Sequence, residues 1–200
     1  MITLPVSHMA RPKEFDRDEV LHVALAVFHR QGYEATSMQD LVDEMGIGRG
    51  SMYETFGNKR ALFEAALARY ADMMASGILT RLDSADNPVN AIARHLREMT
   101  ATTAAAPSTG CFLGNTCVEL APHDPDIANM CRRSMARLEK GFRCALQRAQ
   151  DNGQLPPDKS PQKLARFLVG VIQGLAVLGK GNAPRATLRD MAEVSIAAMS

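Results

Sequence analysis

The chain has 200 residues, of which 46% are hydrophobic, and its 23 Lys and Arg nearly balance its 22 Asp and Glu, so the formal net charge is +1. This balance excludes a protein that binds polyanions through its overall charge, and contact with nucleic acid must depend on where the cations lie. The lack of Trp, an aromatic content of 5% and the lack of alternating β-branched runs predict an all-α protein.

The sequence predicts no membrane or targeting segment. A membrane helix needs about 18 consecutive apolar residues, and the longest candidate, 167–179, is shorter and contains Gln173. The N-terminus lacks the basic start and apolar core of a signal peptide. We therefore expect a cytoplasmic protein with four reduced cysteines. The Cys and His positions predict neither a metal site nor a cofactor.

The N-terminal end precedes the first expected helix, which spans about residues 18–31. We interpret residues 1–12 as a flexible extension or arm. From such a position Arg11 and Lys13 could reach the minor groove of DNA, and the alternative is that they belong to a solvated tail.

The next segment, residues 36–63, is the most informative part of the chain. Two short helices, 37–45 and 48–56, are expected around a tight turn at Gly46, which tolerates a positive φ. Ser37 and the acid three residues after it have the spacing of a capping box. The second short helix carries small, polar and cationic residues on its outer side, as does a helix that enters the major groove. The pattern predicts a helix-turn-helix motif.

This segment resembles the DNA-binding segment of the TetR/AcrR family of bacterial transcriptional regulators. The resemblance is specific because the motifs occur in a fixed order, and it continues more loosely over the rest of the chain. It departs from the family at Gly48, where members often have a Ser or Thr cap, and glycine is the weaker cap. The matching residues are Phe28, Gly32-Tyr33, Ala35-Thr36-Ser37, Asp40-Leu41, Met45-Gly46-Ile47, Gly50-Ser51-Met52-Tyr53, Phe56-Gly57-Asn58-Lys59 and Leu62-Phe63.

The resemblance implies a regulator that is not an enzyme. Members of this family are homodimers, most often repressors, that leave their DNA when a small molecule binds. The implied partners are a near-palindromic double-stranded DNA operator, a second copy of the chain and a small-molecule inducer.

The predicted DNA contacts lie around the two short helices. An Arg fork on guanine is worth roughly 1–3 kcal/mol of discrimination, which makes Arg49 the best base reader, with a phosphate contact as the alternative. Tyr53 and Lys59 are expected to contact phosphates, a role that the resemblance implies for the tyrosine. Glu54 either accepts from cytosine or pairs with Arg49 or Lys59. The full predicted set is Arg11, Lys13, Thr36, Ser37, Arg49, Gly50, Ser51, Tyr53, Glu54, Thr55 and Lys59.

Six further helices are expected after the motif, which makes about nine in all. Proline and asparagine breaks separate helices of about 58–83, 89–105, 112–120, 124–152, 156–180 and 184–199. We expect an extension or arm over 1–12, a three-helix DNA-binding domain over 13–57, and a helical ligand-binding and dimerisation domain over 58–200.

An inducer pocket is expected inside the helical domain, because an apolar cavity between packed helices is a common ligand site. For each single residue the alternative is that it fills the core. The predicted lining is Met74, Ile78, Ile92, His95, Met99, Cys111, Phe112, Asn115 and Leu138.

Cys111 leaves alternative functions open. It lies near the start of a short helix, where the helix dipole favours a thiolate, and segment 109–115 resembles one in a TetR subgroup with cysteine-based sensors. The protein could thus be a redox or electrophile sensor acting through Cys111, or this cysteine is a packing residue. From another class, we consider a small helical enzyme that uses Cys111 with His123, or a ligand-binding module without DNA binding.

An apolar face interleaved with Gly170, Gly174 and Gly179 predicts a helical dimer interface. A symmetric dimer would present two reading helices about 34 Å apart. The predicted interface residues are Phe167, Leu168, Val171, Ile172, Leu175, Met191 and Val194.

Overall fold

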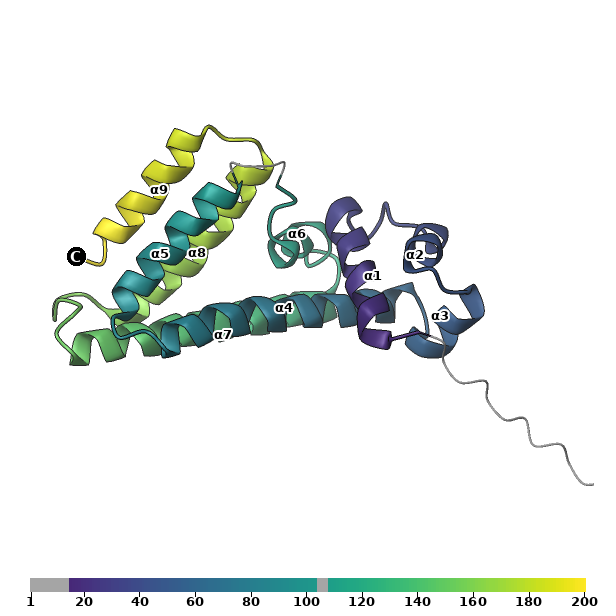
Figure 1. The fold of residues 1–200 in the computed structure, drawn as a ribbon, viewed down its shortest axis with the longest axis horizontal. Helices are drawn as coiled ribbons and strands as arrows, with labels where there is room; N and C mark the ends of the chain where they lie inside the picture. Colours follow the sequence, from purple (N-terminus) through teal and green to yellow (C-terminus); the bar gives the residue numbers. More distant parts are fainter. Residues whose placement is uncertain (1–14, 104–107) are drawn as a thin grey trace, which may run out of the picture.

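The structure, a computed structural model, describes residues 15–103 and 108–200. All regular structure in these ranges is helical, which confirms the predicted all-α fold (Figure 1). Arg11 and Lys13, predicted to form an arm, lie outside the described residues. The nine helices of the described ranges are α1 (Arg17–Gln31), α2 (Met38–Met45), α3 (Arg49–Phe56), α4 (Lys59–Asp83), α5 (Pro88–Thr103), α6 (Phe112–Glu119), α7 (Pro125–Asp151), α8 (Pro161–Lys180) and α9 (Arg185–Ala197).

Two long helices connect the two ends of the molecule. Helices α1, α2 and α3 form one end, and α5, α8 and α9 form the other (Figure 1). Helices α4 and α7 pack side by side along the length between them. The short helix α6 contacts α4, α7 and α8 and lies beside α1, so it stands between the two ends.

Local sequence explains where α2 and α3 begin and end. The Ser37 Oγ accepts the Asp40 amide at 3.0 Å, and the Asp40 carboxylate accepts the Ser37 amide at 2.8 Å. These two bonds complete the predicted capping box. Gly46 then ends α2 with a φ of 64°. Gly48 begins α3 without a side-chain cap, because glycine has no acceptor to offer.

The first hydrophobic core holds α1, α2 and α3 against the start of α4. Its centre is aromatic: the Phe28 and Phe63 rings meet edge to face with centroids 5.1 Å apart, and Phe112 lies 5.5 Å from Phe63. Phe112 belongs to α6 and Cys131 to α7, and both are buried in this core. Packing is therefore continuous from the helix-turn-helix into α6 and α7, and the predicted boundary between residues 57 and 58 stays a prediction.

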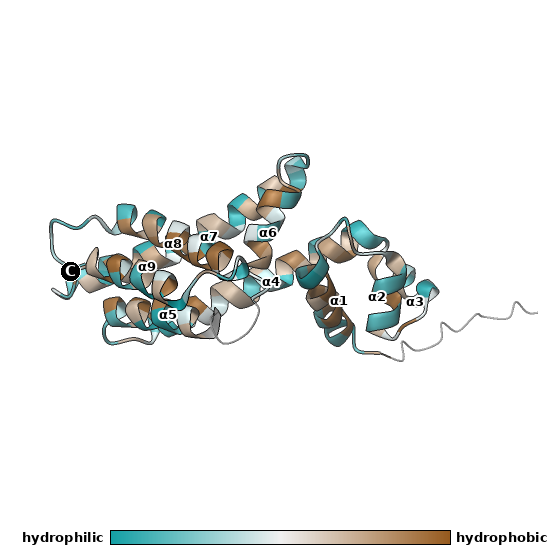
Figure 2. Ribbon diagram, turned by 90° about the horizontal axis from the view of Figure 1, so that it is seen from above, coloured by the Kyte–Doolittle hydropathy of each residue, from teal (hydrophilic) through white to brown (hydrophobic). Residues whose placement is uncertain are grey.

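The second core lies among the far half of α4 and helices α5, α7, α8 and α9. Phe142 and Leu146 of α7 and Leu168 of α8 are almost completely buried there. Most helices in Figure 2 show hydrophobic and hydrophilic residues side by side, as expected for helices that bury one face.

Helix α8 is longer than the apolar segment 167–179, which was too short to predict a membrane helix. By length and composition it could cross a membrane, and it is the one helix of residues 15–103 and 108–200 that could. It nevertheless packs against α7 and α9 in the second core, and it carries Lys163 and Arg166. These features are those of a core helix in a helical bundle.

Candidate nucleic-acid interface

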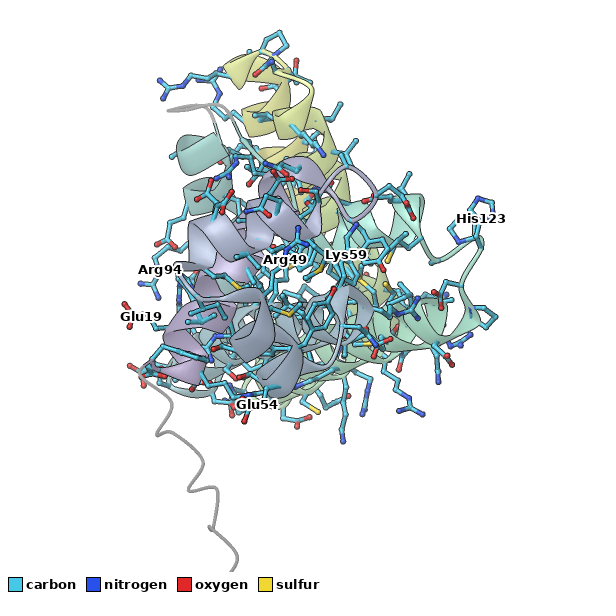
Figure 3. The ribbon with its side chains drawn as sticks, turned by 90° about the vertical axis from the view of Figure 1, so that its right-hand side faces the viewer. Glu19, Arg49, Glu54, Lys59, Arg94 and His123 are labelled. Atoms are coloured by element: carbon cyan, nitrogen blue, oxygen red, sulfur yellow. The ribbon has the colours of Figure 1, made fainter. Side chains whose placement is uncertain are left out.

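The outward face of α3 is defined by the residues that the core leaves exposed. Met52 and Phe56 are buried against the first core, and this turns the positions between them outward. Arg49, Gly50 and Glu54 are exposed, and Tyr53 keeps 49% of its surface exposed. Figure 3 shows Arg49, Glu54 and Lys59 at the end of the molecule that faces the viewer.

A neutral side chain orients the Arg49 guanidinium. Its Nη2 donates to the Gln39 Oε1 of α2 at 2.9 Å. An amide acceptor leaves the positive charge of the guanidinium uncompensated, whereas a carboxylate would have neutralised it. A Cβ added at the neighbouring Gly50 would meet nothing within 4 Å. The start of α3 is therefore cationic and sterically open.

Of the two alternatives for Glu54, pairing with Arg49 or Lys59 is not found among the residues that the structure describes. Arg49 is bonded to Gln39, and the Lys59 Nζ lies 4.4 Å from the centroid of the Tyr33 ring, in a cation–π contact. Glu54 is exposed at the edge of α3, so its carboxylate stays open to solvent.

Thr36 and Ser37 differ sharply, although both were predicted to contact DNA. Thr36 is only 1% exposed, its hydroxyl donates to the Gly32 carbonyl at 2.6 Å, and its amide donates to the Tyr33 carbonyl. Both donors of Thr36 are thus used inside the protein, and we withdraw it as a DNA contact. Ser37 is exposed, and its Oγ accepts the Asp40 amide as a helix cap, so its contact with DNA stays a prediction.

Ser51 and Thr55 lie at the margin of this face. Both are half-buried, and the Thr55 Oγ1 has no hydrogen-bond partner within the part of the chain that the structure describes. The exposed face thus reduces to positions 49, 50, 53 and 54, with Ser37 and Lys59 beside it.

Sequence reasoning missed a connection between the helix-turn-helix and α6. The Glu119 Oε1, at the last position of α6, accepts the backbone amides of Tyr33 at 2.9 Å and Glu34 at 3.0 Å. These amides belong to the turn between α1 and α2. Gly32 begins this turn with a φ of 85°, and a Cβ there would stand 2.9 Å from the Glu119 Oε2. The turn therefore needs both the glycine and the carboxylate.

Two further contacts join α1 and the start of α4 to the segments on either side of α6. The Arg60 guanidinium of α4 binds both carboxylate oxygens of Asp124, which also caps α7 through the amides of Asp126 and Ile127. Arg60 and these amides lower the pKa of the Asp124 carboxyl to about 2. The His29 ring of α1 lies with its Nε2 3.0 Å from the Gly110 carbonyl, so this nitrogen donates.

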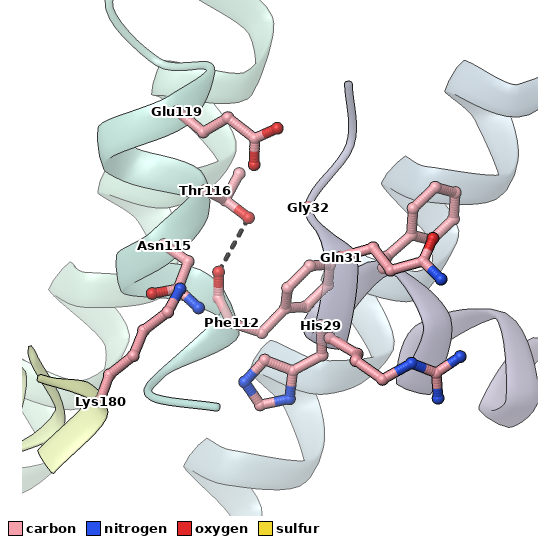
Figure 4. Close-up of a pocket in the computed structure, with 10 residues that line it drawn as sticks. His29, Gln31, Gly32, Phe112, Asn115, Thr116, Glu119 and Lys180 are labelled. Carbon is pink, nitrogen blue, oxygen red and sulfur yellow. Dashed lines mark hydrogen bonds between the residues drawn. The ribbon is translucent and has the colours of Figure 1, made fainter. Parts of the chain in front are cut away.

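The residues predicted to line the inducer pocket lie in separate places within the described part of the chain. Phe112 and Asn115 line a cavity of about 130 Å³ between α1, α6 and the end of α8 (Figure 4). Ile78 and His95 line a separate space of about 10 Å³ between α4, α5 and α7, which is room for about one water. The remaining predicted residues fill the cores: Met74, Ile92, Met99 and Leu138 in the second, and Cys111 against the first.

Comparison with known proteins agrees with this geometry. Residues 20–66 match the family model of bacterial regulatory proteins of the tetR family, and residues 87–192 match that of the tetracyclin repressor-like C-terminal domain. The chain belongs to the TetR family.

Its relatives in this family include regulators of several bacteria. It is 36% identical over 193 residues to the uncharacterised HTH-type transcriptional regulator YezE of Bacillus subtilis, covering 96% of this chain and 100% of YezE. It is 35% identical to the HTH-type transcriptional repressor ComR of Escherichia coli, with 93% and 90% covered. Among solved structures, a cysteine mutant of the TetR-family regulator CifR, complexed with 26-bp operator DNA, is 30% identical, with a TM-score of 0.83 and 96% and 100% covered.

The dimer face predicted for this TetR-family chain is largely used within one copy. Leu168, Val171, Ile172 and Leu175 are buried in the second core, because an apolar stripe cannot reveal from sequence which neighbour it meets. The large apolar residues that remain exposed on α8 and α9 are Phe167, Val177 and Val194, of which Val177 was not predicted. Met191 is partly buried against the same core.

The thiol–imidazole pair of the alternative enzyme reading is not assembled. Cys111 caps the start of α6, and His123 is exposed beyond its other end (Figure 3). Eight helical residues span about 12 Å, well beyond hydrogen-bond reach. The TetR family consists of DNA-binding regulators, which are not enzymes.

Proposed function

We propose that the protein is a cytoplasmic repressor that binds a near-palindromic operator as a homodimer and leaves it when a small molecule binds. The observation that carries this proposal is the exposed face of α3, where Arg49 is oriented by Gln39 without losing its charge. The repressor ComR and the operator-bound CifR mutant support it as relatives.

In this proposal α3 reads one major groove, and its neighbours fix the register. Arg49 contacts guanine, and Tyr53, Ser37 and Lys59 donate to phosphates on either side. Lys59 starts α4, where free backbone amides favour an anion. Dimerisation through Phe167, Val177 and Val194 places a second α3 about one DNA turn away.

Release by a small molecule would act through α6. Glu119 links α6 to the α1–α2 turn, and the cavity of about 130 Å³ lies between the same two elements. A ligand that binds better when α6 is displaced would shift the population toward a state with poorly spaced reading helices. A coupling of roughly 1–3 kcal/mol changes operator affinity about 5–150-fold.

The experiment that tests the proposal is selection of genomic fragments on the purified protein, followed by sequencing of what is retained. Recovery of one near-palindromic site is the expected result. An Arg49→Ala protein, with Arg185→Ala as a matched control, should lose that site selectively. Retention of fragments without a common sequence, or of none, would contradict the proposal and favour a ligand-binding module.

A second candidate is a thiol sensor acting through Cys111. The observation in its favour is that the Cys111 Sγ accepts the Gly114 amide of α6 at 3.4 Å, and that burial and the neighbouring Cys111 raise the pKa of Tyr70 of α4. Alkylation there would disturb a contact between these two helices. If a Cys111→Ser protein still left its operator on treatment with an electrophile, this candidate would be removed.

A further inference from the structure

A chain of side-chain hydrogen bonds joins α2 to the start of α3, beside the exposed face. The Arg49 Nη2 donates to the Gln39 Oε1 at 2.9 Å, and the Gln39 Nε2 donates to the Asp43 Oδ1 at 2.6 Å. All three side chains are exposed. Asp43 lies four residues after Gln39 on α2, whereas Arg49 begins α3. The Gln39 amide is thus held between a carboxylate and a guanidinium that belong to different helices.

These two neighbours fix the direction of the amide. A carboxylate only accepts hydrogen bonds, and a guanidinium only donates them. The Gln39 nitrogen must therefore face Asp43, and its oxygen must face Arg49. An amide nitrogen carries two N–H groups and an amide oxygen two lone pairs, so Gln39 keeps one donor and one lone pair for a further partner. Arg49 uses one N–H group on Gln39 and keeps its others for a base.

An ordinary helix pair is the simplest alternative for Gln39 and Asp43. Residues four positions apart on a helix are neighbours, and Gln–Asp hydrogen bonds of this kind stabilise helices by themselves. Gln147 and Asp151 form such a pair on α7, at 3.0 Å. The pair on α2 has in addition the bond from Arg49, which places the amide beside the head group that is expected to reach a base. The pair on α7 therefore serves as the control.

We propose that Gln39 reads an adenine next to the base that Arg49 contacts, and that Asp43 is the positioning residue that holds the Gln39 amide for it. This inference rests on the proposed function, since it needs Arg49 in the major groove. Adenine presents there an N6–H donor and an N7 acceptor, which a glutamine amide binds with its oxygen and its nitrogen. The lone pair and the N–H group that Gln39 retains match them.

The distance between the two side chains fits two neighbouring bases. Successive bases along one strand are about 3.4 Å apart. The Gln39 Oε1 is 2.9 Å from the Arg49 Nη2, so the amide lies about one base step from the guanidinium. When Arg49 contacts a guanine, the amide of Gln39 is therefore placed at the adjacent base pair.

The role of Asp43 can be separated from that of its charge. A carboxylate close to DNA repels the phosphates, so its removal alone strengthens binding to any sequence. An Asn at position 43 has the same shape but both donates and accepts, and it therefore permits both directions of the Gln39 amide. Asp43→Asn should lower the preference for adenine several-fold while affinity for unrelated DNA rises. A role in helix stability alone would not produce these two opposite effects.

The test is selection by the full chain from a library of random duplexes, followed by sequencing of the bound fraction. The parent should enrich a guanine and an adenine at adjacent positions of each half-site. Gln39→Met keeps a long unbranched side chain without the amide, and it should lower the preference for adenine about 5–150-fold, which corresponds to about 1–3 kcal/mol. Gln147→Met, which breaks the control pair on α7, should leave the enriched sequence unchanged.

Titrations with two duplexes that differ only at the adenine position assign the contact. Asp43→Asn should reduce the difference in affinity between them. Glu44→Gln should not, because it removes the same charge from the next residue of α2, which is bonded to Arg30 of α1. If Asp43→Asn left the difference as it is in the parent, the positioning role would be refuted.

Two other outcomes would overturn the base-reading role of Gln39. One is an adenine preference that Gln39→Met leaves unchanged. The other is a Gln39→Met protein that loses only the preference for guanine, since Gln39 would then merely orient Arg49. Failure of the proposed function is seen separately, because a parent protein without it would enrich no sequence at all.

Discussion

The link between α6 and the α1–α2 turn can be tested by replacing Glu119 with Ala. One carboxylate oxygen accepts two backbone amides, those of Tyr33 and Glu34, at 2.9 and 3.0 Å. Each hydrogen bond to a charged acceptor is worth about 1.5–3 kcal/mol when it is shielded. These amides are partly open to water, which replaces the carboxylate in the variant, so we expect a total loss of about 1–2 kcal/mol.

The loss should appear first at the two amides. Hydrogen exchange at Tyr33 and Glu34 should accelerate about 5–30-fold, because each 1.4 kcal/mol is a factor of ten. The melting temperature should fall by about 2–8 °C. Exchange in the second core, for example at Leu168, should change only as far as the global stability does.

Val118→Ala is the matched control for this variant. Val118 precedes Glu119 on α6 and is 77% exposed, so its truncation should stay within about 0.5 kcal/mol of the parent. If the exchange rates at Tyr33 and Glu34 were the same in the two variants, the carboxylate would not hold the turn and the reasoning would be refuted.

Three further predictions concern other parts of the molecule. Arg49→Ala should weaken specific operator binding by about 1–3 kcal/mol while Arg185→Ala does not, and equal losses in a binding titration would contradict the role of α3. Gly48→Ser should add the missing cap and stabilise the protein by about a few tenths of a kcal/mol, measured as a higher denaturant midpoint; a lower midpoint would refute it. The Asp124 carboxyl has a pKa of about 2 in the folded protein against an ordinary value of 3.8. Its contribution is thus complete above pH 4 and is lost as the pH falls toward 2. Asp124→Asn should flatten the acid-unfolding profile in that window, where an unchanged slope would show that Arg60 contributes nothing through this pair.

The helix-turn-helix could be predicted from the sequence because its signals are local. The capping box at Ser37, the turn glycine at Gly46 and the uncapped start at Gly48 each involve residues within a few positions of one another. Such spacings fix backbone geometry before any tertiary contact forms. Most helix limits after residue 58 followed from proline and asparagine breaks for the same reason. The helix expected from residue 156 instead begins at Pro161, because Ser160 is its cap.

Contacts between distant segments could not be predicted in this way. Glu119 and Tyr33 are 86 positions apart, and their bond uses a backbone amide, which leaves no mark in residue type. The apolar stripe of α8 was expected to face a second copy, but Leu168 and Ile172 pack inside one copy. An apolar stripe in a sequence shows that one face of a helix is buried, but it does not show which neighbour covers that face. Thr36 was likewise predicted to contact DNA, but its hydroxyl donates to the Gly32 carbonyl inside the protein.

The Glu119 link has a consequence for exchanging DNA-binding units between related proteins. On the helix-turn-helix side it depends only on two main-chain N–H groups and on the absence of a side chain at Gly32. Any residue except proline supplies such an N–H group. A transplanted unit with different side chains at positions 33 and 34 would therefore still engage this α6, provided that it brings a glycine to the preceding position. Substitutions on α3 could therefore change the operator preference without any change to the contact between Glu119 and the α1–α2 turn.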